Sequence, residues 1–91
     1  MFYAISYGIR DDRRRLKVAQ VLKDFGERVQ LSVFEARLEA RDLDRLKQRV
    51  LKHLDQENDS LRLYPLCGAC VPGIEVLGQG LVTQDAEFII I

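Results

Sequence analysis

The order in which the apolar residues change their spacing constrains the fold of this 91-residue chain more than any other feature. Residues 2–7 are apolar on both alternating faces, as in a strand that is buried on two sides. Residues 16–25 then carry an apolar residue at every third position. Asp11 and Asp12 can cap the start of such a helix, and Gly26 can follow its end. The first third of the chain therefore predicts a strand followed by a helix.

The change from strand-like to helix-like spacing occurs a second time along the chain. Residues 28–38 return to β character and are predicted to form two strands. Residues 40–54 place apolar side chains at 3-4-4 spacing, which predicts a helix with one buried face. Residues 61–67 indicate a further strand, in which Pro65 restricts the pairing to an edge or to the strand end. The complete order is strand, helix, strand, strand, helix, strand.

This order is that of the ferredoxin-like plait, or split βαβ unit, an α+β fold in which both helices cover one face of an antiparallel sheet. Neither face of residues 2–7 is charged, so we expect the uncovered face to be apolar and to require a second sheet against it. Residues 74–77 are a short strand-like piece, and the apolar run 88–91 is expected to add to a sheet of its own chain or of a neighbour. The sequence thus predicts a single domain, residues 1–91, that forms a homodimer.

The charges balance over the chain but not along it. Fourteen basic and fourteen acidic residues give zero net charge, which excludes a strongly basic nucleic-acid binder. Residues 1–38 have eight basic and five acidic side chains, a net +3, and residues 39–91 have six and nine, a net −3. Residues 10–17 alone hold five basic and two acidic residues at the predicted start of a helix. This cluster is either a solvated helix face or a surface that binds phosphate, which Arg28 on a neighbouring strand would widen.

Three further features bear on compartment and chemistry. No apolar run approaches the ~20 residues of a membrane span, and two cysteines are too few for a disulfide scaffold, so a cytoplasmic protein is expected. Cys67 and Cys70 have the spacing of half a zinc site or of a redox pair, but without a second pair the pattern favours two small residues packed in a turn. His53 is expected on the surface.

Four stretches of the chain, taken in order, resemble a known family. They are residues 2–9 (FYAISYGI), 11–18 (DDRRRLKV), 25–35 (FGERVQLSVFE) and 59–67 (DSLRLYPLC). Together they resemble the small second CRISPR-associated protein, the adaptation partner of the Cas integrase, from residue 2 to about residue 78. The resemblance implies a ferredoxin-like homodimer in which the C-terminal segment, residues 79–91, pairs with the partner's sheet.

The resemblance also implies a role in the acquisition of new CRISPR spacers. In this family the dimer bridges two integrase dimers and holds the duplex DNA that is inserted, and many members are described as magnesium-dependent endonucleases of RNA or double-stranded DNA. Two functions are therefore expected as alternatives: a non-catalytic scaffold that binds nucleic acid, or an Mg²⁺-dependent endonuclease. A toxin-like ribonuclease with the same fold is a third, weaker alternative.

The expected catalytic position is altered in this chain. The family ends its first strand in Tyr-Asp, and the two aspartates hold the metal across the dimer; here Tyr7 matches, but the next residue is Gly8. Glycine supplies no oxygen ligand for Mg²⁺. Asp11 is a weak alternative ligand, because we expect Asp11 and Asp12 to cap the helix. Charge and resemblance together predict the following nucleic-acid contacts: Arg13, Arg14, Arg15, Lys17, Arg28, Ser32 and Phe34.

Overall fold

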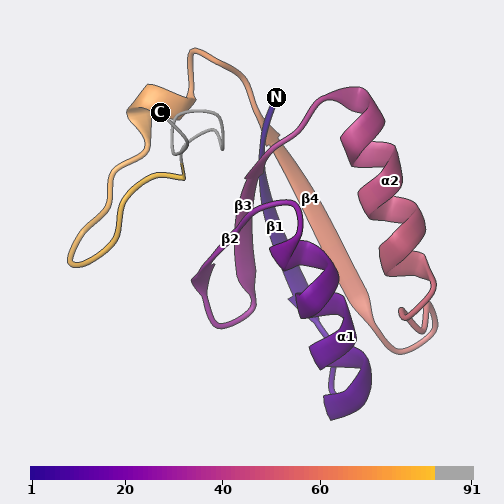
Figure 1. The fold of residues 1–91 in the computed structure, drawn as a ribbon. Coiled ribbons are helices and arrows are strands. Elements are labelled where there is room, and N and C mark those ends of the chain that lie inside the picture. The colour runs from indigo at the N-terminus through magenta and orange to yellow at the C-terminus, as the bar shows by residue number, and fades with distance from the viewer. Residues whose placement is uncertain (84–91) are drawn as a thin grey trace.

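The computed structural model describes residues 1–83 and contains the six predicted elements in the predicted order (Figure 1). These elements and one short 3-10 helix are β1 (Phe2–Gly8), α1 (Asp12–Lys23), β2 (Glu27–Gln30), β3 (Val33–Arg37), α2 (Ala40–Leu51), β4 (Ser60–Leu66) and η1 (Val71–Gly73). The strands form one antiparallel sheet in the order β2-β3-β1-β4. The α+β class and the βαββαβ order are thus confirmed.

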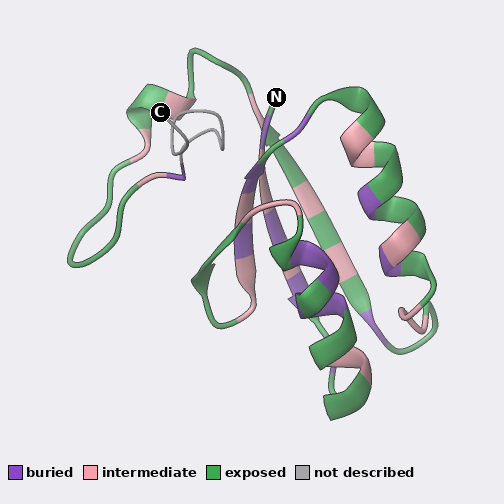
Figure 2. Ribbon diagram, in the orientation of Figure 1, coloured by how far each residue is buried: buried purple, intermediate pink, exposed green. Residues whose placement is uncertain are grey.

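The core lies between the helices and one face of the sheet. Ile5 in β1 stands opposite Phe34 in β3 and Leu63 in β4, and residues opposite each other in antiparallel strands share a face. Ile5 and Phe34 are almost completely buried, together with Val18 and Leu22 of α1 and Leu46 and Val50 of α2. In Figure 2 the buried residues of α1 and α2 are the ones turned toward the strands. Both helices therefore cover the same face of the sheet.

The opposite face is more polar than the sequence predicts. Ala4 stands opposite Glu35 and Tyr64, and Ser6 stands opposite Arg62, so charged side chains surround the small residues of β1. The expectation of an apolar face was wrong because it used β1 alone, whereas the neighbouring strands supply the charges. Phe2 lies on this face too, but it is only 2% exposed, and the Arg37 guanidinium lies 5.3 Å from its ring centre.

Helix α1 begins as predicted but ends for another reason. Asp11 is its N-cap, and the Asp11 carboxylate accepts a hydrogen bond of 2.8 Å from the Arg14 backbone N–H. The helix ends at Lys23 with Asp24 as its C-cap, so Gly26 is not the residue that terminates it. A β-carbon at Gly26 would lie 2.2 Å from the Glu35 carbonyl oxygen, so glycine lets the chain pass close to β3.

Helix α2 buries the predicted face but is shorter than predicted. Leu46 and Val50 are buried, and Leu43 and Leu54 pack against the core at the two ends of the stripe. The helix ends at Leu51, and the backbone N–H of Leu54 still donates to the Val50 carbonyl. Within residues 1–83 no helix combines the length and the apolar character needed to cross a bilayer.

The chain after β4 leaves the sheet. Residues 74–77 form no strand and are not part of the four-stranded sheet, so this prediction was wrong. At Thr83 the chain contacts β3 again. The Thr83 backbone N–H and hydroxyl donate to the Glu35 carboxylate at 3.3 and 3.0 Å, and the Thr83 carbonyl accepts a hydrogen bond from Arg37 at 3.3 Å. The predicted strand at residues 88–91 lies outside the described residues.

Candidate nucleic-acid interface

The end of β1 opens into a cavity of about 470 Å³ that gathers five of the residues singled out from the sequence. The cavity lies between the first turns of α1 and the turn that joins β2 to β3. Its lining includes Tyr7, Gly8, Arg15, Arg28 and Ser32. Exposed apolar Leu16 and Leu31, 61% and 86% accessible, complete its rim. Two guanidinium groups beside apolar surface can bind phosphate while the rim contacts sugar or base.

Arg15 is held in place by the loop that follows β1. Its Nη1 donates to the backbone carbonyl of Ile9 at 3.1 Å and to that of Arg10 at 3.3 Å. Its Nη2 forms an ion pair with Asp12, one helical turn back. These bonds fix the direction of the side chain along the cavity wall, and the side chain stays 41% exposed. Arg15 is therefore pre-positioned and still accessible to an anion.

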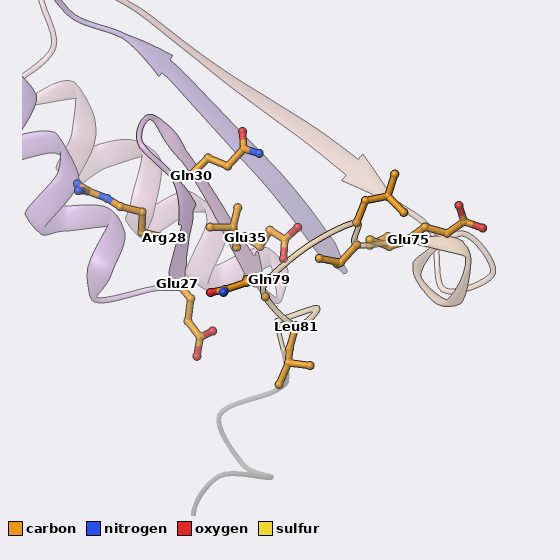
Figure 3. Close-up of a pocket in the computed structure, with 12 residues that line it drawn as sticks. Glu27, Arg28, Gln30, Glu35, Glu75, Gln79 and Leu81 are labelled. Atoms are coloured by element: carbon orange, nitrogen blue, oxygen red, sulfur yellow. The ribbon is translucent and has the colours of Figure 1, made fainter.

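Arg28 is oriented by an aromatic ring. The Arg28 guanidinium carbon lies 5.3 Å from the centre of the Phe34 ring, a cation–π distance. Figure 3 shows its side chain extending from β2 toward the helices and away from Gln79 and Leu81; Arg28 also lines a second hollow, which lies between β2 and residues 74–81. Phe34 itself is fully buried at 0% exposure and contacts Tyr7 with ring centres 6.2 Å apart. Its burial does not fit the predicted contact with nucleic acid: Phe34 instead supports Arg28 from beneath.

Two hydrogen bonds tie the β2–β3 turn to β1. The Tyr7 hydroxyl donates to the Leu31 carbonyl at 3.3 Å, and the Tyr7 backbone N–H donates to the Ser32 carbonyl at 3.1 Å. Tyr7 is 6% exposed and belongs to the core, as the sequence predicted. The turn that carries Ser32 is thus held against the end of β1, beside Gly8.

Position 8 does not need glycine for its backbone conformation. The φ angle of Gly8 is not positive. A β-carbon at this position would meet only the Ser60 hydroxyl, at 3.3 Å. A side chain at position 8 would therefore require a small shift of one flexible hydroxyl group. Glycine at position 8 therefore leaves this part of the cavity without a side chain, although the backbone conformation does not require glycine.

The residues around Gly8 do not fit a magnesium site within one chain. A hard cation requires several oxygen ligands, and Gly8 offers no side chain. Asp11 is engaged as the N-cap of α1, as expected, and Asp12 is paired with Arg15. In the part of the chain that the structure describes, no group of three or more His, Cys, Asp or Glu residues could hold a metal ion.

Arg14 faces away from the cavity. Its Nε and Nη2 donate to the two carboxylate oxygens of Asp59 at 2.8 and 3.1 Å, a bidentate ion pair. The Asp59 side chain is 1% exposed and also accepts the Asp55 backbone N–H at 2.9 Å. This pair joins the start of α1 to the loop before β4. Arg14 therefore serves the fold, a role that the charge cluster did not reveal.

Lys17 and Arg13 also lie apart from the cavity. Lys17 lines a different groove, between α1 and α2, together with Arg49 and His53. Arg13 is exposed in the first turn of α1, and His53 is half-buried rather than fully on the surface. The helical period separates residues that are adjacent in sequence, so the predicted cluster divides among several surfaces.

The Arg14–Asp59 pair predicts a specific pH dependence of stability. The hydrogen bond from Arg14 holds the pKa of Asp59 below its ordinary value of 3.8, despite the opposing effect of burial. A lowered carboxyl pKa adds stability above the unfolded value of about 3.9, and this stability is lost as the pH falls through the folded-state pKa. Asp59→Asn should lower the melting temperature by several degrees at neutral pH and flatten its fall below about pH 4.

Thermal melts between about pH 7 and about pH 2 measure this effect. The matched control is Asp44→Asn, at an exposed carboxylate on α2, which should leave the curve unchanged. Superimposable acid profiles for Asp59→Asn and the unaltered protein would show that the pair contributes nothing to acid stability.

Asp59 is a residue that reasoning from the sequence missed. Asp59 ends a polar run, residues 56–59, that follows the predicted helix, and it was noted only as the first residue of the stretch 59–67. An acidic residue in such a run does not by itself identify a partner 45 positions away.

Comparison with known proteins agrees with this architecture. The family model of the CRISPR associated protein Cas2 matches residues 1–72. The CRISPR-associated endonuclease Cas2 2 of Thermus thermophilus is 51% identical over 93% of this chain and 90% of its own length. The CRISPR-associated endoribonuclease Cas2 1 of Chloroflexus aurantiacus is 44% identical over 100% of this chain and 99% of its own.

Solved structures show the same fold. Streptococcus pyogenes Cas2 superposes with a TM-score of 0.76 and 30% identity, over 86% of this chain and 100% of that one. A chain of a partial Cas6-RT-Cas1–Cas2 complex gives a TM-score of 0.69 and 27% identity, over 84% and 89% of the two chains. The resemblance drawn from four short stretches is thereby confirmed over nearly the whole chain. This protein belongs to the CRISPR-associated protein Cas2 family.

Proposed function

We propose that this protein acts in CRISPR adaptation as a scaffold that binds duplex DNA and bridges two dimers of the Cas integrase, without cutting the DNA itself. The observation that carries this proposal is the cavity at the end of β1. It keeps Arg15 and Arg28 for phosphate, while Gly8 leaves no carboxylate at the position where the family supplies one. The binding of phosphate requires the guanidinium groups of Arg15 and Arg28, but it does not require a carboxylate at position 8.

The bridging role requires two copies of the chain, and the C-terminal segment supports their association. Leu77 and Leu81 are 93% and 88% exposed, although both are large apolar residues in one short stretch. Exposed apolar residues favour burial against another protein surface. We propose that residues 79–91 pair with the sheet of a second copy, so that the Arg15–Arg28 cavity is presented twice.

The integrase is the proposed protein partner. A chain in the partial Cas6-RT-Cas1–Cas2 complex shares this fold at 27% identity, which makes the same kind of assembly the natural expectation for this protein. The cytoplasm is the proposed compartment, because an integration partner must reach DNA there.

A magnesium-dependent endonuclease is the second candidate function. The names of the relatives favour it, since those from Thermus thermophilus and Chloroflexus aurantiacus are called an endonuclease and an endoribonuclease. For this chain the metal would have to be held without a carboxylate at position 8, which is the physical objection to this candidate.

Gly8→Asp separates the two functions. The variant should fold normally, because the new β-carbon meets only the Ser60 hydroxyl. We expect no Mg²⁺-dependent cleavage of duplex DNA or single-stranded RNA by the unaltered protein, and measurable cleavage by the variant. Denaturing gels of labelled substrates, with Mg²⁺ or with a chelator, measure both activities.

The matched control is Gly8→Asn, which has nearly the same shape but no carboxylate and should not cleave. Cleavage by the unaltered protein at the rate of Gly8→Asp would refute the scaffold proposal. The scaffold role itself is tested by spacer integration with the integrase, which should require this protein. Integration that proceeds equally well without it would exclude that role.

A further inference from the structure

We propose that Cys67 and Cys70 form a reversible thiol–disulfide exchange site, at the point where the chain leaves β4. The two sulfur atoms lie 3.1 Å apart, and both cysteines are free and exposed. Their position in a turn was predicted, but their packing was not confirmed, since both side chains face solvent. Because the thiols are exposed and adjacent, a disulfide reagent can react with one of them, and the second thiol can attack the resulting mixed disulfide.

The turn brings the two residues into the geometry of a disulfide. The Cys70 backbone N–H donates to the Cys67 carbonyl at 2.9 Å, and the Val71 N–H donates to the same carbonyl at 3.2 Å. A hydrogen-bonded four-residue turn keeps its first and last Cα atoms within about 7 Å. This is the separation that a disulfide spans without movement of the backbone. The short helix Val71–Gly73, which contains Pro72, restrains the turn from the other side.

The two thiols are not equivalent. Contact with the Cys70 thiol, and then the backbone N–H groups of Cys70 and Ala69, lower the pKa of Cys67. The Cys67 thiol in turn raises the pKa of Cys70. Because the thiolate is the nucleophile, Cys67 is the attacking residue and Cys70 is the resolving residue.

The exchange takes a disulfide RSSR as its co-reactant. The Cys67 thiolate attacks one sulfur of RSSR, a mixed disulfide of Cys67 with SR forms, and one thiolate leaves and is protonated by the proton that Cys67 released. The Cys70 thiol then loses its proton, and its sulfur attacks Cys67, which forms the Cys67–Cys70 disulfide and expels the second thiol. Two electrons pass from the cysteine pair to RSSR, which is reduced to two RSH.

Oxidised glutathione is the probe that tests this site. The full-length reduced chain is incubated with glutathione disulfide and a chelator, then quenched with acid, alkylated with N-ethylmaleimide and weighed intact. We expect a product that is two hydrogens lighter and takes up no alkyl group, and its complete return to two alkylated thiols after treatment with dithiothreitol. A stable glutathione adduct of the unaltered chain, or a disulfide between chains, would overturn the proposal.

The order of attack is tested in the unaltered chain. Acid quenching at early times, followed by peptide mapping, should find the transient glutathione adduct on Cys67, and an adduct on Cys70 instead would contradict the assignment of Cys67 as the nucleophile. Cys70→Ser should stop at the mixed disulfide on Cys67, because no second thiol remains to expel glutathione, and loss of glutathione from this variant without dithiothreitol would show that Cys70 is not the resolving residue. Thermal melts of this variant establish that it is folded, which the exposed position of Cys70 favours.

Discussion

Replacement of Arg15 and Arg28 together by glutamine is expected to weaken the binding of duplex DNA by roughly tenfold to a hundredfold. Both guanidinium groups line the cavity at the end of β1, and each is aimed by other groups: Arg15 by the carbonyls of Ile9 and Arg10, and Arg28 by the Phe34 ring. Pre-positioned charged side chains lose little conformational entropy on binding. Their replacement should therefore remove most of the binding free energy that these contacts contribute.

The dependence of binding on salt distinguishes this effect from a general loss of charge. Each phosphate contact releases counterions, so the slope of log affinity against log salt should become shallower by about two for each protomer that loses both arginines. Fluorescence anisotropy with a labelled duplex at several salt concentrations measures affinity and slope together. The loss should be similar for unrelated sequences, because phosphate contacts carry no sequence information.

The matched control removes the same charge from another surface. Arg41 and Arg45 are exposed on α2, away from the cavity lining, so the double variant Arg41→Gln and Arg45→Gln should keep nearly full affinity. An equal loss of affinity in both double variants would show that binding follows net charge, and that the cavity is not the binding surface.

Replacement of Phe34 by alanine is expected to destabilise the protein by about 3–5 kcal/mol. Phe34 is fully buried at the centre of the sheet, opposite Ile5 and against Tyr7. Domains of this size have about 5–15 kcal/mol of stability in total, so this loss removes a large part of it. Urea unfolding followed by far-UV circular dichroism measures the change.

Phe34→Leu separates the role of Phe34 in the core from a direct contact. Leucine keeps most of the buried apolar volume, so this variant should remain folded, and it should lose no more DNA affinity than Arg28→Gln, because the ring acts through Arg28. Only the aromatic support beneath Arg28 is lost. A folded Phe34→Leu protein that binds DNA more weakly than Arg28→Gln would show that the ring itself is part of the interface.

Local pattern was sufficient for the element order but not for the surface. The periods of residues 2–7, 16–25 and 40–54 predicted the strands and helices, because each element buries one face or stripe of its own residues. The polar outer face of the sheet was not predictable from β1. Glu35, Tyr64 and Arg62 reach that face through the register of β3 and β4, which is a property of pairing rather than of any single strand.

The predicted contact residues show the same division. Arg13, Arg14, Arg15 and Lys17 form one cluster in the sequence, yet a helix turns each residue by about 100° from the last. Arg15 therefore lies at the cavity, Arg14 pairs with Asp59, and Lys17 lines the groove between the helices.

The sequence by itself determined the fold class, the family and the absence of a carboxylate at position 8, because periodicity, motif order and residue identity are all local properties. Only the tertiary structure decided which charges meet. It placed Arg28 of β2 and Arg15 of α1 around one cavity, buried Phe34 beneath Arg28, and paired Arg14 with Asp59. The physical reason is that contacts between distant segments depend on strand register and helix packing, which no window of the sequence contains.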